Sequence, residues 1–130
     1  MALNNTTAAV IVTYNRSAKL VRVIEALLAQ TVRPDAIYVI DNASTDDTAA
    51  VVGRMTDPSI RHVRLPENIG GAGGFHEGMR IAYEGGARWL WISDDDAYPE
   101  PDALQKLIDA ISGFEARYRW RPSFACSNVK

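Results

Sequence analysis

The feature that most constrains the fold is the alternation of short apolar runs with segments of helical periodicity along the chain. The apolar runs are rich in β-branched or aromatic residues and are bounded by polar or turn-forming residues, as is typical of buried strands. Strands that alternate with helices favour a parallel sheet with helices on both faces and right-handed crossovers. The sequence therefore predicts a Rossmann-like α/β fold. The predicted strands are residues 8–13, 36–40, 60–65, 88–93 and 123–129.

Each predicted helix follows a strand, and three of them have one clear apolar face. The helices are predicted at residues 17–30, 44–55, 75–86 and from 102 onward. Ser17 is the expected N-cap of the first helix, and Ser44 with Asp47 has the spacing of a capping box for the second. The residues expected to be buried are Leu20, Val23, Ile24, Leu27 and Leu28 in the first helix, Phe75, Met79 and Ala82 in the third, and Leu104, Leu107, Ile108 and Ile111 in the fourth.

Length, charge and cysteine content limit the classes of protein to which the chain can belong. Its 130 residues suit one domain, expected over residues 8–130 after a loose lead at residues 1–7. The net charge of −2 gives no electrostatic basis for binding nucleic acid. The single cysteine, Cys126, rules out an intramolecular disulfide, fits a reducing compartment, and is expected to be a buried structural thiol. We expect neither a signal peptide nor a membrane span.

Three adjacent carboxylates, those of Asp94, Asp95 and Asp96, follow a tryptophan-containing apolar strand. Two unit charges about 5 Å apart repel by roughly 3 kcal/mol at an effective dielectric constant near 20. A divalent cation removes this repulsion, because hard cations bind oxygen ligands and often bring phosphate groups with them. The sequence therefore favours a metal–diphosphate site here. The alternative is a solvated acidic turn whose aspartates cap the next helix.

Polar residues also follow the first two predicted strands. Asn15 and Arg16 come after the first strand, and Asp41 ends the second. These residues could contact a nucleotide, with Asp41 accepting hydrogen bonds from a base or ribose; the alternatives are a solvated turn and a helix cap. Because parallel α/β sheets bind ligands outside the carboxyl ends of their strands, the convergence of three such clusters predicts a ligand site.

A glycine-rich segment, residues 66–74, is predicted to be a loop. It fails the pattern G-x-G-x-x-G because His76 stands where the last glycine would be, and the chain has no P-loop sequence. Four glycines in five residues still indicate unusual backbone angles or a backbone that a ligand approaches closely. The free N–H groups of the helix that follows favour an anion, although a plain connecting loop is the alternative. We assign no role to His62 or His76.

Four motifs together resemble the inverting glycosyltransferases of family 2, which have the GT-A fold. They are VIVTYNR at residues 10–16, VIDNASTD at 39–46, ENIGGAGGF at 67–75 and WISDDDA at 91–97. Each is weak alone, but four in this order are specific, and the resemblance covers residues 8–129. The glycine-rich segment and the acidic stretch look closest to those of rhamnosyltransferases and galactofuranosyltransferases.

The resemblance implies a sugar-nucleotide transferase with a UDP-sugar or a dTDP-sugar as donor. Asp41 would hydrogen-bond the base, and Asp94 with Asp96 would hold Mn²⁺ or Mg²⁺ on the diphosphate as an Asp-x-Asp motif, with Asp95 near the ribose. In the family the end of the first strand lines the base and ribose pocket; its residues here are Thr13, Tyr14, Asn15 and Arg16. The glycine-rich segment lies by the donor, which implicates Asn68, Gly70, Gly71, Gly73 and Gly74.

Family members continue well beyond the length of this chain, with the acceptor pocket and the general base. The resemblance therefore implies a GT-A domain truncated on its C-terminal side, which binds donor weakly and transfers no sugar. We expect an exposed strand edge and apolar patch to drive self-association. The complete enzyme would act on a glycan or lipid-linked acceptor, in the cytoplasm, at the inner face of the plasma membrane.

Two other functions fit parts of the pattern. The chain could be a non-catalytic nucleotide- or cation-binding module. It could also be a nucleotidyltransferase of related architecture. Nucleotidyltransferases carry a glycine-rich, arginine-containing motif directly after the first strand, where this chain has Thr-Tyr-Asn-Arg.

Overall fold

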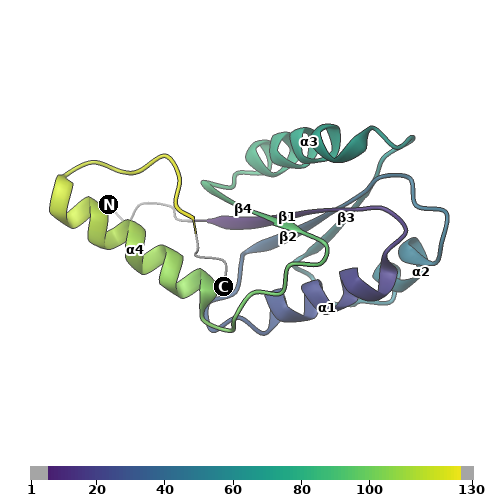
Figure 1. Cartoon of the computed structure of the whole chain (residues 1–130), viewed down its shortest axis with the longest axis horizontal. Coiled ribbons are helices and arrows are strands. Elements are labelled where there is room, and N and C mark those ends of the chain that lie inside the picture. Colours follow the sequence, from purple (N-terminus) through teal and green to yellow (C-terminus); the bar gives the residue numbers. More distant parts are fainter. Residues whose placement is uncertain (1–5, 127–130) are drawn as a thin grey trace.

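The computed structural model describes residues 6–126 and shows a parallel four-stranded sheet flanked by helices (Figure 1). The strand order is β3-β2-β1-β4, and α3 covers one face while α1 and α2 cover the other. This confirms the predicted α/β class. In chain order the elements are β1 (Thr7–Thr13), α1 (Ser17–Leu28), β2 (Ala36–Asp41), α2 (Thr48–Gly53), β3 (Ile60–Arg64), α3 (Gly70–Glu84), β4 (Trp89–Asp94) and α4 (Ala103–Tyr118).

The core lies in two layers, one on each side of β1 and β2. Successive strand residues point to opposite faces, so Ile11 and Val39 pack against α1, whereas Val10 and Ile40 pack under α3. Full burial of one such side chain stabilises the fold by about 1.5–3 kcal/mol relative to its exposure. The face predicted for α1 is confirmed for Leu20, Val23, Ile24 and Leu27, which are buried, whereas Leu28 is only half-buried against the same core.

Helix α3 begins at Gly70, inside the segment that the sequence predicts to be a loop. Glycine lowers helix propensity, which is why the pattern indicates a loop. The structure gives another reason for two of the glycines. A Cβ atom on Gly74 would lie 2.6 Å from Val12 Cγ1, and one on Gly78 would lie 2.6 Å from Val10 Cγ1. These glycines let α3 approach the sheet closely.

Two helix starts differ from the predicted caps. Arg16 occupies the N-cap position of α1, and Ser17 is the first helical residue. Helix α2 begins only at Thr48, so Ser44 does not cap it. Instead the Asp46 carboxylate accepts hydrogen bonds from Thr48 Oγ1 at 2.5 Å and from its backbone N–H at 3.0 Å. These bonds lower the pKa of Asp46.

The chain ends of the described region bring further corrections. Strand β1 begins at Thr7, whose N–H donates to Asp35 Oδ2 at 2.8 Å, so this part of the expected loose lead is ordered. No strand forms within residues 121–126, and the rest of the predicted fifth strand lies outside the described residues. Cys126 is exposed, so the predicted buried thiol is wrong.

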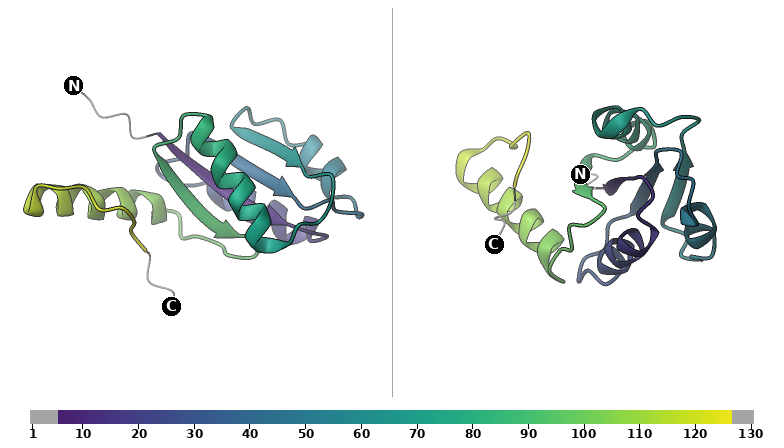
Figure 2. Two further views of the ribbon diagram at one scale, coloured as in Figure 1. Left: turned by 90° about the horizontal axis from the view of Figure 1, so that it is seen from above. Right: turned by 45° about the vertical axis from the view of Figure 1, so that its right-hand side comes forward.

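Helix α4 stands off from the sheet, beside the β4 edge (Figure 2). Of its predicted buried stripe only Leu104 is buried, at 3% exposure, because most of the helix has no layer packed on its apolar face within residues 6–126. Met79 on α3 is likewise 37% exposed. No helix in the described part of the chain is long and apolar enough to cross a membrane.

Candidate functional site

The acidic turn after β4 lies beside the end of β1, as the sequence predicts. Parallel pairing sets Val12 opposite Asp94 and so brings Thr13 next to Asp95. The Asp95 side chain is 7% exposed; it accepts a hydrogen bond from Thr13 Oγ1 at 2.9 Å and one from Arg16 Nη1 at 3.2 Å. Three residues predicted for the donor site therefore form one hydrogen-bonded cluster.

The other two aspartates of the turn are more open. The Asp96 side chain is 44% exposed, and its Oδ2 lies 3.5 Å from Arg16 Nη1 and 3.7 Å from Lys19 Nζ. Asp94 is exposed, and its carboxylate has no hydrogen bond or ion pair with a described residue. The sequence reasoning missed Lys19. Its spacing from Arg16 was the available signal, because residues three apart share one side of a helix.

The residues of this turn fit a hard divalent cation whose ligands are completed by a substrate. Within residues 6–126 no group of three or more His, Cys, Asp or Glu side chains is arranged to hold a metal ion. Mg²⁺, however, commonly uses one or two carboxylates together with phosphate oxygens. Two cationic groups, those of Arg16 and Lys19, already lie against carboxylate oxygens of Asp95 and Asp96. The same oxygens suit a metal ion.

Asp41, at the end of β2, is fully buried and has partners on both carboxylate oxygens. Oδ1 accepts the backbone N–H of Ser44 at 2.8 Å, while Oδ2 lies 3.3 Å from His62 Nε2 and 3.4 Å from Arg64 Nη1. Sequence reasoning assigned His62 no role, because its acidic partner is 21 residues away along the chain. The alternation of His62 and Arg64 on one face of β3 is the signal that could have found them. The nucleobase of a donor can reach the Asp41 carboxylate only if the side chain of His62 or Arg64 moves aside.

Asn15 holds two loops together instead of pointing only to solvent. It adopts a positive φ of 51°, which asparagine tolerates better than most residues. Its backbone N–H donates to Ser44 Oγ at 3.0 Å, and its Oδ1 accepts the N–H groups of Thr45 at 2.7 Å and Asp46 at 3.2 Å. The predicted strand-end clusters of β1 and β2 are thus one structure.

The start of α3 joins the same edge of the sheet through Asn42, which the sequence reasoning missed. Its side chain is buried, donates to the Gly70 carbonyl at 2.9 Å and accepts the Ile69 N–H at 3.1 Å. Asn68 Oδ1 accepts the Gly70 N–H at 2.9 Å. Gly71 is exposed in the first turn of α3, whereas Gly74 is buried against the sheet. Of the predicted glycines, those of the first turn are thus open to a ligand.

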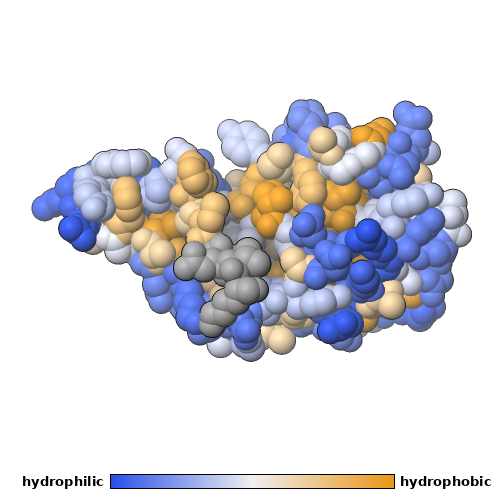
Figure 3. Space-filling model, viewed as in Figure 1, coloured by the Kyte–Doolittle hydropathy of each residue, from blue (hydrophilic) through white to orange (hydrophobic). Residues whose placement is uncertain are grey.

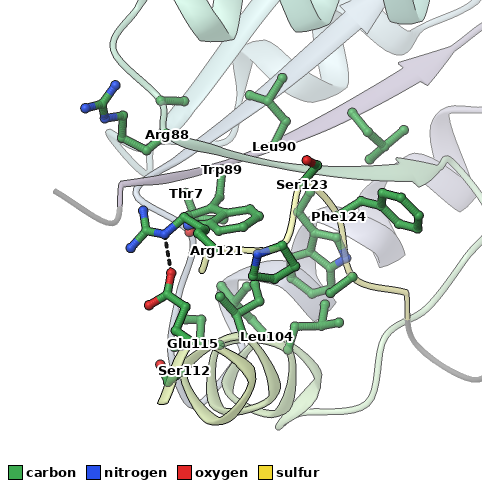
Figure 4. A pocket seen from close by; sticks show the side chains of 18 of the residues that line it. Thr7, Arg88, Trp89, Leu90, Leu104, Ser112, Glu115, Arg121, Ser123 and Phe124 are labelled. Carbon is green, nitrogen blue, oxygen red and sulfur yellow. Dashed lines mark hydrogen bonds and ion pairs between the residues drawn. The ribbon is translucent and has the colours of Figure 1, made fainter. Parts of the chain in front are cut away.

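A separate apolar groove of about 770 Å³ lies between β4 and α4. Apolar surface gathers over this region (Figure 3), and the close view shows Trp89, Leu90 and Phe124 around the groove (Figure 4). The ion pair of Arg121 with Glu115 closes one end, and the Arg121 guanidinium lies 5.7 Å from the Trp89 ring centre. Phe124 is 78% exposed. The groove follows the edge of the sheet and is distinct from the acidic turn.

Comparison with known proteins places the chain in a family. The family model "Glycosyl transferase family 2" matches residues 8–118. The galactofuranosyltransferase GlfT1 of Mycolicibacterium smegmatis is 37% identical over 91 residues, which cover 70% of this chain and 30% of GlfT1. The succinoglycan biosynthesis protein ExoO of Rhizobium meliloti is 34% identical over 100 residues, covering 77% of this chain and 28% of ExoO. The chain thus spans less than a third of these relatives.

Solved structures share the fold. The structure of S. aureus TarS 1–349 in complex with UDP matches with a TM-score of 0.71 and 21% identity, covering 88% of this chain and 33% of TarS. The mannosyltransferase PcManGT from Pyrobaculum calidifontis, in complex with GDP-Man and Mn²⁺, matches with a TM-score of 0.66 and 24% identity, covering 79% of this chain and 31% of PcManGT. The Rossmann-like sheet of GT-A type is confirmed.

Proposed function

The chain belongs to glycosyl transferase family 2, and from this membership we propose that it forms the nucleotide-binding part of a glycosyltransferase that uses a UDP-sugar or a dTDP-sugar. The observation that carries the proposal is the cluster of Thr13, Arg16 and Asp95 at the carboxyl edge of the parallel sheet, where α/β proteins bind ligands. Family membership favours transfer over the two alternatives, a binding module and a nucleotidyltransferase.

The donor's diphosphate is assigned to the acidic turn and the first turn of α3. Asp94 and Asp96 would hold Mn²⁺ or Mg²⁺, which supplies Lewis-acid stabilisation of the departing nucleoside diphosphate. The N–H groups of the first turn of α3 after Gly70, whose own N–H donates to Asn68, suit the phosphates, because a helix N-terminus attracts anions. The base is assigned to Asp41 and the ribose to Asp95. The remaining residues assigned to the donor are Thr13, Tyr14, Asn15, Arg16, Asn68, Gly70, Gly71 and Gly73; Gly74 is left out because it packs against the sheet.

We propose that residues 1–130 alone transfer no sugar. Inverting transfer to a glycan or lipid-linked acceptor needs a general base at the acceptor hydroxyl. The carboxylates after Asp96 have other partners: Asp102 pairs with Lys106 at 3.0 Å, Asp109 accepts from Gln105 Nε2 at 2.7 Å, and Glu115 pairs with Arg121. Glu100 is an exposed residue of the loop before α4. The general base is therefore assigned to a part of the enzyme outside this chain. We also propose that the complete enzyme is cytoplasmic and acts at the inner face of the plasma membrane.

A second copy of the chain is the proposed occupant of the β4 edge. Within residues 6–126 no strand pairs with the outer edge of β4, and the apolar groove runs along it. Two copies related by a two-fold axis can pair these edges antiparallel, which satisfies both rows of backbone groups. A net charge of −2 opposes this only weakly. Sedimentation at tens of micromolar should show a dimer that Phe124→Glu weakens; a clean monomer would refute the pairing.

Titration calorimetry of UDP and dTDP, with Mn²⁺ and with EDTA, tests the donor site. Binding is expected only with metal and is expected to be lost in Asp96→Ala. Asp109→Ala is the matched control, because it removes an exposed aspartate of α4 outside the proposed site. Equal binding by wild type and Asp96→Ala would refute the metal assignment. Absence of nucleotide binding under every condition would refute the donor site in this chain.

A further inference from the structure

We infer that Arg16 is a resident counterion of the acidic turn that exchanges partners when the donor binds. In the free protein it neutralises Asp95 and Asp96; on loading with a divalent cation it gives up Asp96 and turns its guanidinium to the donor's diphosphate. The inference rests on the proposed function, because it assigns a role to a residue of that same site.

The geometry shows one cation shared between two carboxylates. Arg16 Nη1 lies 3.2 Å from Asp95 Oδ1 and 3.5 Å from Asp96 Oδ2, and Lys19 Nζ adds a contact of 3.7 Å to the same Asp96 oxygen. Three consecutive carboxylates thus have two cations, and only the third, Asp94, lacks a partner among the described residues. Repulsion between Asp95 and Asp96 is thus relieved without metal.

The contacts differ in how easily they can be exchanged. Asp95 is 7% exposed and keeps the hydrogen bond from Thr13 whether or not Arg16 stays. Arg16 is 52% exposed and Asp96 is 44% exposed, so their pair is solvated and weak. Asp96, whose contacts with Arg16 and Lys19 are long and solvated, would hold a divalent cation in their place. The exchange therefore takes place on the outer side of the turn.

Arg16 is also well placed to bind the diphosphate that arrives with the metal. Only Nη1 of its guanidinium is engaged by described residues, which leaves the other N–H donors of the planar fork available. Such a fork binds phosphate oxygens bidentately. Arg16 stands at the N-cap of α1, a helix of 12 residues, where the helix dipole adds to the attraction for an anion.

The partner exchange predicts effects of opposite sign in one variant. Arg16→Gln removes the competitor for Asp96, so binding of Mn²⁺ without nucleotide should tighten by about 2–5-fold, as expected from the loss of an exposed ion pair. The same variant removes a charged donor to phosphate, so UDP binding with Mn²⁺ should weaken by about 10–100-fold. Arg16→Lys keeps the positive charge but loses the planar guanidinium, so it should weaken UDP binding and leave the affinity for Mn²⁺ near that of the wild type.

The experiment measures the two ligands separately. Electron paramagnetic resonance of free Mn²⁺ gives metal affinity without nucleotide, and calorimetry gives UDP affinity with metal. Arg80→Gln is the charge-matched control, because Arg80 pairs with Glu77 and Glu84 on α3 and should leave both affinities unchanged. Urea midpoints check folding, and Arg16→Lys carries the test where Arg16→Gln is unfolded.

Mn²⁺ binding that is weakened or unchanged in Arg16→Gln overturns the inference, and so does absence of Mn²⁺ binding in both wild type and Arg16→Gln. UDP affinity that Arg16→Gln and Arg16→Lys both leave intact also overturns it. Failure of the donor site gives a different result: the wild type then binds no nucleotide, while the Mn²⁺ comparison still decides whether Arg16 competes for Asp96.

Discussion

Alanine at Gly74 tests whether the glycines of α3 serve packing or donor binding. The added Cβ would lie 2.6 Å from Val12 Cγ1 and 3.3 Å from Asn42 Nδ2. Val12 is β-branched and stiff at χ1, so it cannot rotate away without strain. Overpacking of this kind costs about 1–3 kcal/mol. The higher helix propensity of alanine offsets up to about 1 kcal/mol of this cost.

Gly71→Ala is the matched comparison. It lies in the same helix, and a Cβ there would meet nothing within 4 Å. Because both variants gain helix propensity, the difference between their free energies of unfolding reports mainly the clash, about 1–3 kcal/mol with Gly74→Ala the less stable. At about 3–5 °C per kcal/mol for a chain of 130 residues, the melting temperatures should differ by roughly 3–15 °C.

Urea unfolding followed by far-UV circular dichroism measures this difference, with the slope checked for constancy between variants. Calorimetry with UDP and Mn²⁺ on the folded variants separates the two roles. Equal urea midpoints for Gly74→Ala and Gly71→Ala would refute the packing argument. A normal midpoint combined with loss of UDP binding in Gly74→Ala would mean that this glycine contacts the donor.

Three further predictions concern hydrogen-bonded side chains in loops and at strand ends. Hydrogen bonds from Ser59, together with Arg33, lower the pKa of Asp57 from 3.8 to about 2. A pKa that is lower in the folded state gives stability that is present above the unfolded pKa and lost as pH falls, so urea midpoints should drop between about pH 4 and about pH 2, and less so in Asp57→Asn. Asn42→Ala removes two bonds to the start of α3 and should lower the free energy of unfolding by about 1–3 kcal/mol in urea titrations; an unchanged midpoint would contradict it. Asp41→Asn should speed amide hydrogen exchange at Ser44, whose N–H donates to Asp41; unchanged exchange would show that the negative charge of Asp41 does not stabilise this turn.

The strands were predictable because buried parallel strands are continuous apolar runs. β1 and β2 match their predicted ranges to within one residue at each end. The start of α3 was not predictable, because glycine has low intrinsic helix propensity. The sheet below explains only Gly74 and Gly78, since a Cβ on Gly70 or Gly71 would meet nothing within 4 Å. The apolar stripe of α4 was predicted correctly as a pattern. A stripe shows which face favours burial, but it does not show which layer covers that face, and Leu104 alone is buried.

The sequence predicts the location of the site but not the contacts within it. Parallel topology brings the ends of β1, β2 and β4 to one edge, so the convergence of their polar residues followed from the order of elements. The contacts of Asp41 with His62 and Arg64 could not be predicted from the order of elements, because they depend on the register that sets Asp41 opposite Arg64. The link from Asn15 to the loop after β2 depends on a positive φ that no periodic pattern reveals.

The two buried aspartates of this edge are held in the same way. An ionised carboxylate is costly to bury unless it is paired. Asp95 has an inner donor in Thr13 Oγ1 and an outer one in Arg16, whose side chain is 52% exposed. Asp41 has an inner donor in the Ser44 N–H and two outer partners, His62 Nε2 at 3.3 Å and Arg64, whose side chain is 48% exposed. We expect the inner bond to hold each carboxylate in position when an outer partner is exchanged. A ligand that supplies its own cation or N–H group to these oxygens can therefore replace an arginine without leaving a buried charge unpaired, and it meets carboxylates that are already in place.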